Sequence, residues 1–263
     1  MTSLRNVGAL VEKEWRHYFG SPIAWVALTM WTLLFGLFYF LVLDRFLEIS
    51  MQSAQQTEFG GAPKISLNDW VISGVLHNMA VVALFITPML TMRLFAEEKR
   101  HGTMELLSTA PITALQIVLG KFLGALSLYA AMIAAGLLNF ALLWTYATVP
   151  PERKPVATGA LGLLLVGASF IAIGLFLSTL TRNQIVAGTL TFGLLLGFWI
   201  LGWLDQPSAG PLTKALAYLG LLTHLEELMK GVLDLKDIVF YLSVTFFGLF
   251  LAHQSVESQR WRA

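Results

Sequence analysis

The sequence predicts an all-α membrane protein with six transmembrane helices. It also predicts an N-terminal amphipathic interfacial helix, a short helix in the loop between spans two and three, and a re-entrant helical hairpin before span six. Of the 263 residues, 56% are hydrophobic and only 13% are charged. The mean hydropathy is +0.70, outside the range of ordinary soluble domains. Apolar segments long enough to cross a bilayer recur along the chain, which favours a membrane protein over a soluble one.

Residues 1–20 have the pattern of an amphipathic helix. Leu10, Trp15 and Phe19 belong to an apolar face at helical spacing, while Lys13 and Arg16 lie on the remaining surface. Aromatic side chains suit the depth of lipid headgroups, and cations suit an anionic leaflet. We therefore expect this helix to lie along the membrane interface; a short soluble helix is the alternative. Charges run through the segment, so no cleavable signal peptide is expected.

Six segments have the length and composition of membrane spans. The predicted spans are 22–43, 70–92, 114–146, 156–180, 185–204 and 235–253. The first contains no charged residue and as a helix extends about 33 Å, enough to cross a bilayer. Thr113 and Gln116 can form a capping box that begins span three, whose first turns place Lys121 near the water.

Polar stretches separate the spans. Residues 44–69 are expected to be an external loop with room for a short helix, 148–155 a tight turn with three prolines, and 254–263 a polar tail. Residues 214–220 and 223–233 have helical apolar patterns too short to cross a membrane. We expect them to form the re-entrant or surface hairpin before span six.

The external hairpin carries four polar candidates, which are His224, Glu226, Glu227 and Lys230. A solvated face with a Glu-to-Lys pair at i, i+4 is the simpler interpretation, and a gating role is the alternative. Within the spans, Asn139 and His77 are interpreted as helix-to-helix hydrogen bonds rather than substrate contacts. Gly193 and Gly197 have the GxxxG spacing that lets two membrane helices approach closely, although chance produces such spacing often.

The cations predict the orientation in the membrane. On the side of the termini lie Arg5, Lys13, Arg16, Arg93, Lys99, Arg100, Lys121, Arg182, Arg260 and Arg262. On the other side lie Arg45, Lys64, Arg153, Lys154, Lys214, Lys230 and Lys236. Cytoplasmic loops carry the excess of Lys and Arg, so both termini are expected in the cytoplasm.

Several kinds of chemistry are missing from the sequence. No GxxxxGK[ST] or HExxH motif occurs, and there is no cysteine. The net charge of +1 does not favour a nucleic acid as a partner. We therefore expect no catalytic residue, no metal site and no cofactor on this chain.

The longest polar run between two spans is the loop from Arg93 to Thr113. Gly102 is expected to end one helix, Thr103 to cap a short second one, and Pro111 to stop it. Such an amphipathic helix has the right shape to lodge in a groove on a soluble partner, with an ordinary solvated loop as the alternative.

This loop resembles a signature of the ABC-2 type permeases, the membrane subunits of a class of ATP-binding-cassette transporters. The matching residues begin at Glu97 and read EEKRHGTMELLSTAPIT, then LGKFL around Phe122. They are similar to the family pattern E-E-K/R-x-x-G-T-x-E-L-L-x-x-x-P. The stretch HLEELMKGVLDLKDIVFYLSV, from His224 to Val244, resembles the branch that includes gliding-motility-associated permeases. The resemblance covers essentially the whole chain, 1–263, as a single transmembrane domain.

The resemblance implies a transport subunit, not an enzyme, in a bacterial cytoplasmic membrane. It implies that residues 102–109 form a cytoplasmic coupling helix that docks on a separate ATPase subunit, which would hold ATP and Mg²⁺. The implied contact residues are Glu97, Glu98, Arg100, Gly102, Thr103, Glu105, Leu106 and Leu107. It further implies a working unit of two permease chains, identical or related, with two ATPase chains. Gly193 and Gly197 would then lie near the contact between the permease chains, and the external hairpin would cap the pathway.

Two other functions are compatible with a bundle of apolar helices. An ion-coupled secondary carrier is disfavoured because no ionisable residue lies in the middle of a predicted span. A membrane scaffold without transport activity is not excluded by any residue. The transported substrate cannot be read from the sequence.

Overall fold

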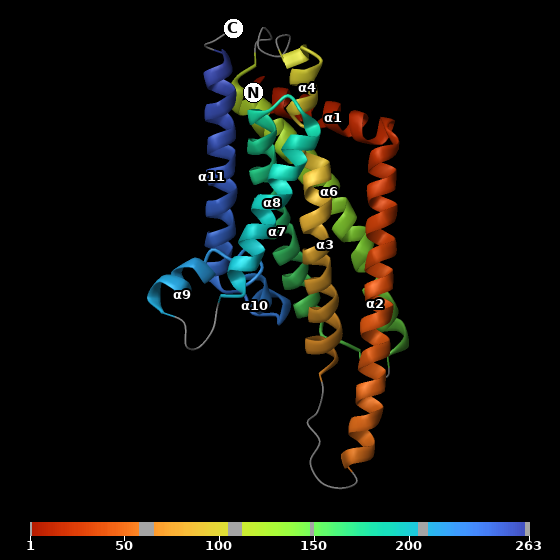
Figure 1. Ribbon diagram of the computed structural model, residues 1–263. Helices are drawn as coiled ribbons and strands as arrows, with labels where there is room; N and C mark the ends of the chain where they lie inside the picture. Colours follow the sequence, from red (N-terminus) through yellow and green to blue (C-terminus); the bar gives the residue numbers. More distant parts are fainter. Residues whose placement is uncertain (1, 58–65, 105–111, 148–149, 205–209, 261–263) are drawn as a thin grey trace.

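The structure is a computed structural model that describes residues 2–57, 66–104, 112–147, 150–204 and 210–260 (Figure 1). Within these ranges every regular element is a helix, and six helices are long and apolar enough to cross a membrane. Helix α1 and the end of α11 lie at the same end of the bundle (Figure 1). The predicted class, an all-α membrane protein with six spans, is therefore confirmed.

Seven long helices and several short ones make up the described chain. They are α1 (Thr2–Gly20), α2 (Pro22–Thr57), the π-helix η1 (Asn68–Ile72), α3 (Ser73–Thr91), α4 (Ala96–Arg100), α6 (Ala114–Tyr146), α7 (Arg153–Leu180), α8 (Gln184–Gly202), α9 (Pro211–Ala217), α10 (Leu225–Met229) and α11 (Leu235–Arg260). The third span begins where its capping box predicted: Thr113 accepts from the Gln116 backbone, and Gln116 accepts in return from the Thr113 backbone.

Helix α7 forms the centre of the bundle. It packs against α3, α6, α8, α10 and α11. Of its most apolar stretch 72% is buried, against 17% for α2 and α8 and 22% for α11. The outer helices instead turn large apolar side chains outwards, such as Phe40 of α2 and Phe246 of α11. These outer faces are suited to lipid or to another membrane chain.

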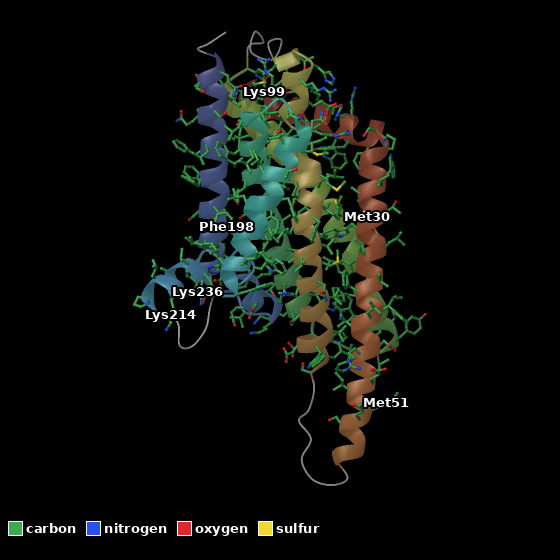
Figure 2. The ribbon with its side chains drawn as sticks, in the orientation of Figure 1. Met30, Met51, Lys99, Phe198, Lys214 and Lys236 are labelled. Carbon is green, nitrogen blue, oxygen red and sulfur yellow. The ribbon has the colours of Figure 1, made fainter. Side chains whose placement is uncertain are left out.

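Two helices are longer than the sequence predicted. Helix α2 continues to Thr57, so the loop expected from residue 44 is wrong in its first part, and α11 continues to Arg260 through the expected polar tail. Hydropathy marks where a helix leaves the membrane, but the helix ends only where a breaker or a cap stops it. Neither extension contains Gly or Pro. The far part of α2, with Met51, projects beyond the other helices at the end opposite the termini (Figure 2).

The predicted hairpin before span six is present as two short helices, α9 and α10, at the end of the bundle away from the termini (Figure 1). Their seven and five residues are far fewer than the roughly 20 that a span requires. Helix α10 packs against α7 and α3.

Candidate functional site

The loop after span two is anchored to the central helix by one serine. Ser178 of α7 accepts hydrogen bonds from the backbone N–H groups of Phe95 and Ala96, at 3.0 and 3.1 Å, and donates to the carbonyl of Met92 at 3.2 Å. Ser178 is fully buried, so it supplies the start of α4 with partners that its own backbone cannot provide. The position of this serine in the sequence gives no signal of the contact, because 80 or more residues separate the partners.

A buried ionic cluster joins the same loop to α1 and α6. The ammonium of Lys121 lies 2.9 Å from a carboxylate oxygen of Glu14 and 2.9 Å from one of Glu98. The three side chains are 2%, 7% and 13% exposed. Lys13 also pairs with Glu98 at 2.9 Å, from a half-exposed position. We call Glu14, Lys121, Glu98 and Lys13 the ionic cluster.

The expectation that Lys121 lies near the water is wrong, because α1 covers it. Helix α1 reaches α6 closely at Gly124, where an added Cβ would lie only 2.8 Å from the Cβ of Glu14. Burial of a charge is costly unless it is paired, and two carboxylates supply the pairing here. Glu14 could have been found from the sequence, since it lies four residues from Leu10 and four from Tyr18, on the buried stripe of α1.

Five of the eight predicted partner-contact residues are described, and they lie in α4 or directly after it. Glu97 is partly buried, with His17 of α1 3.9 Å away. Arg100, Gly102 and Thr103 are exposed at the end of the bundle that holds the termini. Gly102 has a φ of +71°, the left-handed conformation that favours glycine, so the prediction that it ends a helix is confirmed. Glu105, Leu106 and Leu107 lie outside the described residues.

Thr103 makes a contact back to α4. Its hydroxyl donates to the carbonyl of Glu98 at 3.3 Å. The exposed segment from Arg100 to Thr103 therefore follows directly from a helix that the ionic cluster and Ser178 hold in place.

The hairpin candidates lie at the opposite end of the molecule. His224 is buried, with one ring nitrogen 2.7 Å from Asp237 and the other 2.9 Å from the carbonyl of Tyr218, and it stacks on Phe240 at 4.0 Å. Figure 2 labels Lys214 and Lys236 near this hairpin and Lys99 at the other end of the bundle. The His224 to Asp237 pair was missed because neither residue belongs to a recognisable motif.

The other three hairpin candidates are exposed or partly exposed. Lys230 pairs with Glu227 at i, i+3 and 3.3 Å, so the predicted i, i+4 pair with Glu226 is wrong. Lys230 is the C-cap residue of α10, and its ammonium reaches the carboxylate of Glu227, three residues earlier. Glu226 is exposed.

Other polar or small residues in the spans do not form the contacts expected within this chain. Asn139 donates to the carbonyl of Gly136 in its own helix at 2.9 Å, so the predicted helix-to-helix bond is replaced by a local one. His77 is exposed on α3. Gly193 and Gly197 are exposed on α8, and a Cβ added to either would meet nothing within 4 Å. A close helix contact at these glycines would therefore need a second chain.

Comparison with known proteins gives a family match over most of the chain. Residues 8–243 match the family described as ABC-2 family transporter protein. The chain is also similar to the probable ABC transporter permease protein NosY of Pseudomonas aeruginosa, with 29% identity over 152 residues. That match covers 54% of this chain and 53% of the relative, so the chain spans about half the length of this relative.

Proposed function

The chain belongs to the ABC-2 family of transporter proteins, and on that basis we propose that it is the permease subunit of an exporter driven by a separate ATPase subunit. In this proposal ATP and Mg²⁺ bind to the ATPase subunit, and the working unit contains a second permease chain, identical or related. The membrane is the cytoplasmic membrane of a bacterium, with both termini in the cytoplasm.

The main support for this proposal is that the loop after span two is held firmly against the bundle. Helix α4 is bound to α7 through Ser178 and to α1 and α6 through the ionic cluster. A force applied to the exposed segment at Gly102 and Thr103 would therefore act on several spans at once rather than bend a loose loop. Such a rigid connection is what a subunit needs if closure of a partner is to shift the bundle between inward-open and outward-open arrangements.

Co-purification tests the proposed partner. The ATPase encoded beside this chain should co-purify with the full-length protein, and should do so far less when residues 102–109 are scrambled. Scrambling the external residues 210–217 is the matched control and should leave co-purification unchanged. Failure to co-purify, or equal recovery with both scrambled segments, would refute the proposed coupling site.

ATP hydrolysis by the reconstituted complex that responds to a candidate substrate would eliminate the scaffold alternative.

Cysteine labelling tests the proposed orientation. The chain contains no cysteine, so a single introduced thiol gives labelling without background. In intact cells, an impermeant maleimide should label Lys214→Cys and should label Thr103→Cys only after the membrane is opened. Both positions are exposed in the structure.

One observation favours an ion-coupled carrier as a second candidate. The sequence offered no ionisable group inside the bundle, but the structure buries Lys121 between two carboxylates. Against this candidate, the cluster is balanced in charge and lies near the end of the bundle. Uptake into proteoliposomes driven by an ion gradient without ATP would support the carrier.

A further inference from the structure

A cavity of about 270 Å³ lies beside the ionic cluster, at the end of the bundle that holds the termini. Its walls come from α1, from the end of α3 with α4, and from α6. It has far more room than one water molecule needs, since a water occupies about 30 Å³ in the liquid.

Three buried polar atoms on residues that line this cavity have no hydrogen-bond partner among the described residues. They are the hydroxyl of Tyr18, Nε of Arg93 and Oε2 of Glu98. The first two are donors and the third is an acceptor. Burial, followed by the nearby Glu14 carboxylate, raises the pKa of Tyr18 well above its usual range, so its hydroxyl keeps its proton. Buried polar groups nearly always have partners, which makes three in one cavity a sign of a missing ligand.

The charges around the cavity define what that ligand must carry. The four members of the ionic cluster balance one another in charge, and Arg93 and Glu97 are the other Arg, Lys, Asp or Glu residues in the cavity wall. Arg93 forms no ion pair with the described carboxylates, so it and the Tyr18 hydroxyl offer two donors to an anion. The unpartnered oxygen of Glu98 can accept a hydrogen bond, and a cationic N–H group is the strongest donor to a carboxylate. A molecule that carries both an anionic group and an ammonium group can form hydrogen bonds with all three atoms.

The position of the cavity points to a lipid. Met89 of the membrane-spanning helix α3 forms part of the wall and is 56% exposed, and Leu90 and Leu94 extend this apolar side. Lys13 and His17 of α1 also line the cavity, and their polar side chains are half exposed. The cavity therefore lies between a surface suited to hydrocarbon and one suited to water, the depth at which phospholipid headgroups reside.

We propose that this cavity binds the headgroup of an aminophospholipid. Its phosphodiester accepts hydrogen bonds from Tyr18 and Arg93, its primary ammonium donates to Glu98, and its acyl chains lie along the surface at Met89. Free phosphoethanolamine shares the polar chemistry but lacks the acyl chains. The proposal requires only that the chain lies in a membrane, and its lipid-binding test needs no ATPase, although Glu98 and Thr103 of the cavity wall also belong to the proposed partner contact.

Lipid binding to the full-length protein in detergent tests the headgroup. Native mass spectrometry should show that phosphatidylethanolamine is retained about tenfold more tightly than phosphatidylcholine, whose quaternary ammonium has no N–H to donate to Glu98. Phosphatidylglycerol, which has no ammonium group, should also bind more weakly. Equal retention of the three lipids, or a site filled by water alone, would overturn the proposal. Binding of free phosphoethanolamine as tight as that of the lipid would overturn the assignment to a membrane lipid.

Two conservative variants test the residues. Tyr18→Phe and Arg93→Gln should each weaken retention of phosphatidylethanolamine about tenfold, and should shrink the rise in melting temperature that this lipid produces. The controls are Tyr146→Phe and Arg5→Gln, which change exposed residues away from the cavity. A purely structural role would lower the melting temperature of the lipid-free protein but leave the lipid-induced rise intact, and that result would contradict the proposal.

Discussion

At the scale of single residues, the molecule depends on a few buried polar side chains that join distant parts of the chain. Lys121 connects α6 to α1 and to α4 through two carboxylates at 2.9 Å. Ser178 connects α7 to α4 through two backbone N–H groups. Each of these contacts replaces hydrogen bonds to water that were lost on burial. Removing one partner therefore leaves the other buried without a hydrogen-bond or ion-pair partner.

Lys121→Met should be strongly destabilising. The variant leaves Glu14 and Glu98 buried without their shared cation, which should lower the free energy of unfolding by about 3–5 kcal/mol. Denaturation with SDS in mixed micelles measures this. Lys13→Met is the control, because Lys13 is half exposed and its pair should contribute less than about 1 kcal/mol. Equal effects of the two variants would show that burial of the cluster does not matter for stability.

Ser178→Ala should loosen the start of α4. Two backbone N–H groups would lose their acceptor, at about 1–3 kcal/mol of stability. We expect the variant to co-purify with the ATPase but to show little stimulation of ATP hydrolysis by substrate. Ser243→Ala removes an exposed serine whose hydroxyl donates to the carbonyl of Val239 in its own helix, and it should behave as the unmodified protein does. Normal stimulation in Ser178→Ala would argue against transmission through this contact.

At the scale of helices, the all-α class and the six spans were predictable, whereas the π-helix η1 and the ends and side contacts of the helices were less so. The capping box at Thr113 predicted the start of α6, because a cap is a local interaction. The end of α2 was not predictable from hydropathy, because hydropathy falls where the chain enters water, whether or not the helix ends there. The buried state of Lys121 depends on α1, which lies more than 100 residues earlier, so no local pattern reveals it. The pairing of His224 with Asp237 likewise requires α10 and α11 to be placed together.

The hairpin before the last span should open when its buried histidine is removed. His224→Leu leaves Asp237 and the carbonyl of Tyr218 without a partner, which we expect to destabilise the hairpin by about 2–3 kcal/mol. Limited proteolysis should then cut between α9 and α11 faster than in the unmodified protein. Glu226→Gln, at an exposed position, should leave the cleavage rate unchanged. Unchanged proteolysis of His224→Leu would mean that other contacts hold the hairpin.

At the scale of the whole molecule, the outer helices expose apolar faces against which a second permease chain could pack. Gly193 and Gly197 leave a shallow strip on α8 that no part of the described chain fills. Close approach of two backbones at such a strip is a common way for membrane helices to associate. The family membership predicts a pair of permease chains, and this strip is our proposed contact.

Replacing both glycines by leucine should separate the two permease chains without unfolding either one. Each added side chain would meet nothing nearby in its own chain, so the melting temperature of the monomer should change little. Light scattering coupled to size-exclusion chromatography should show a shift from dimer to monomer. Gly8→Leu, on an exposed face of α1, should leave the oligomeric state as it was. A dimer that survives the double substitution would place the contact elsewhere.

The most direct test of the central claim is photo-crosslinking in membranes that contain the assembled complex. A photoreactive amino acid at Thr103, beside the segment held by Ser178 and the ionic cluster, should crosslink to the ATPase subunit. The same amino acid at Lys214, at the opposite end of the molecule, should give no such product. A crosslink to the ATPase from Lys214 and none from Thr103 would contradict the account, since the partner would then bind the other end of the bundle.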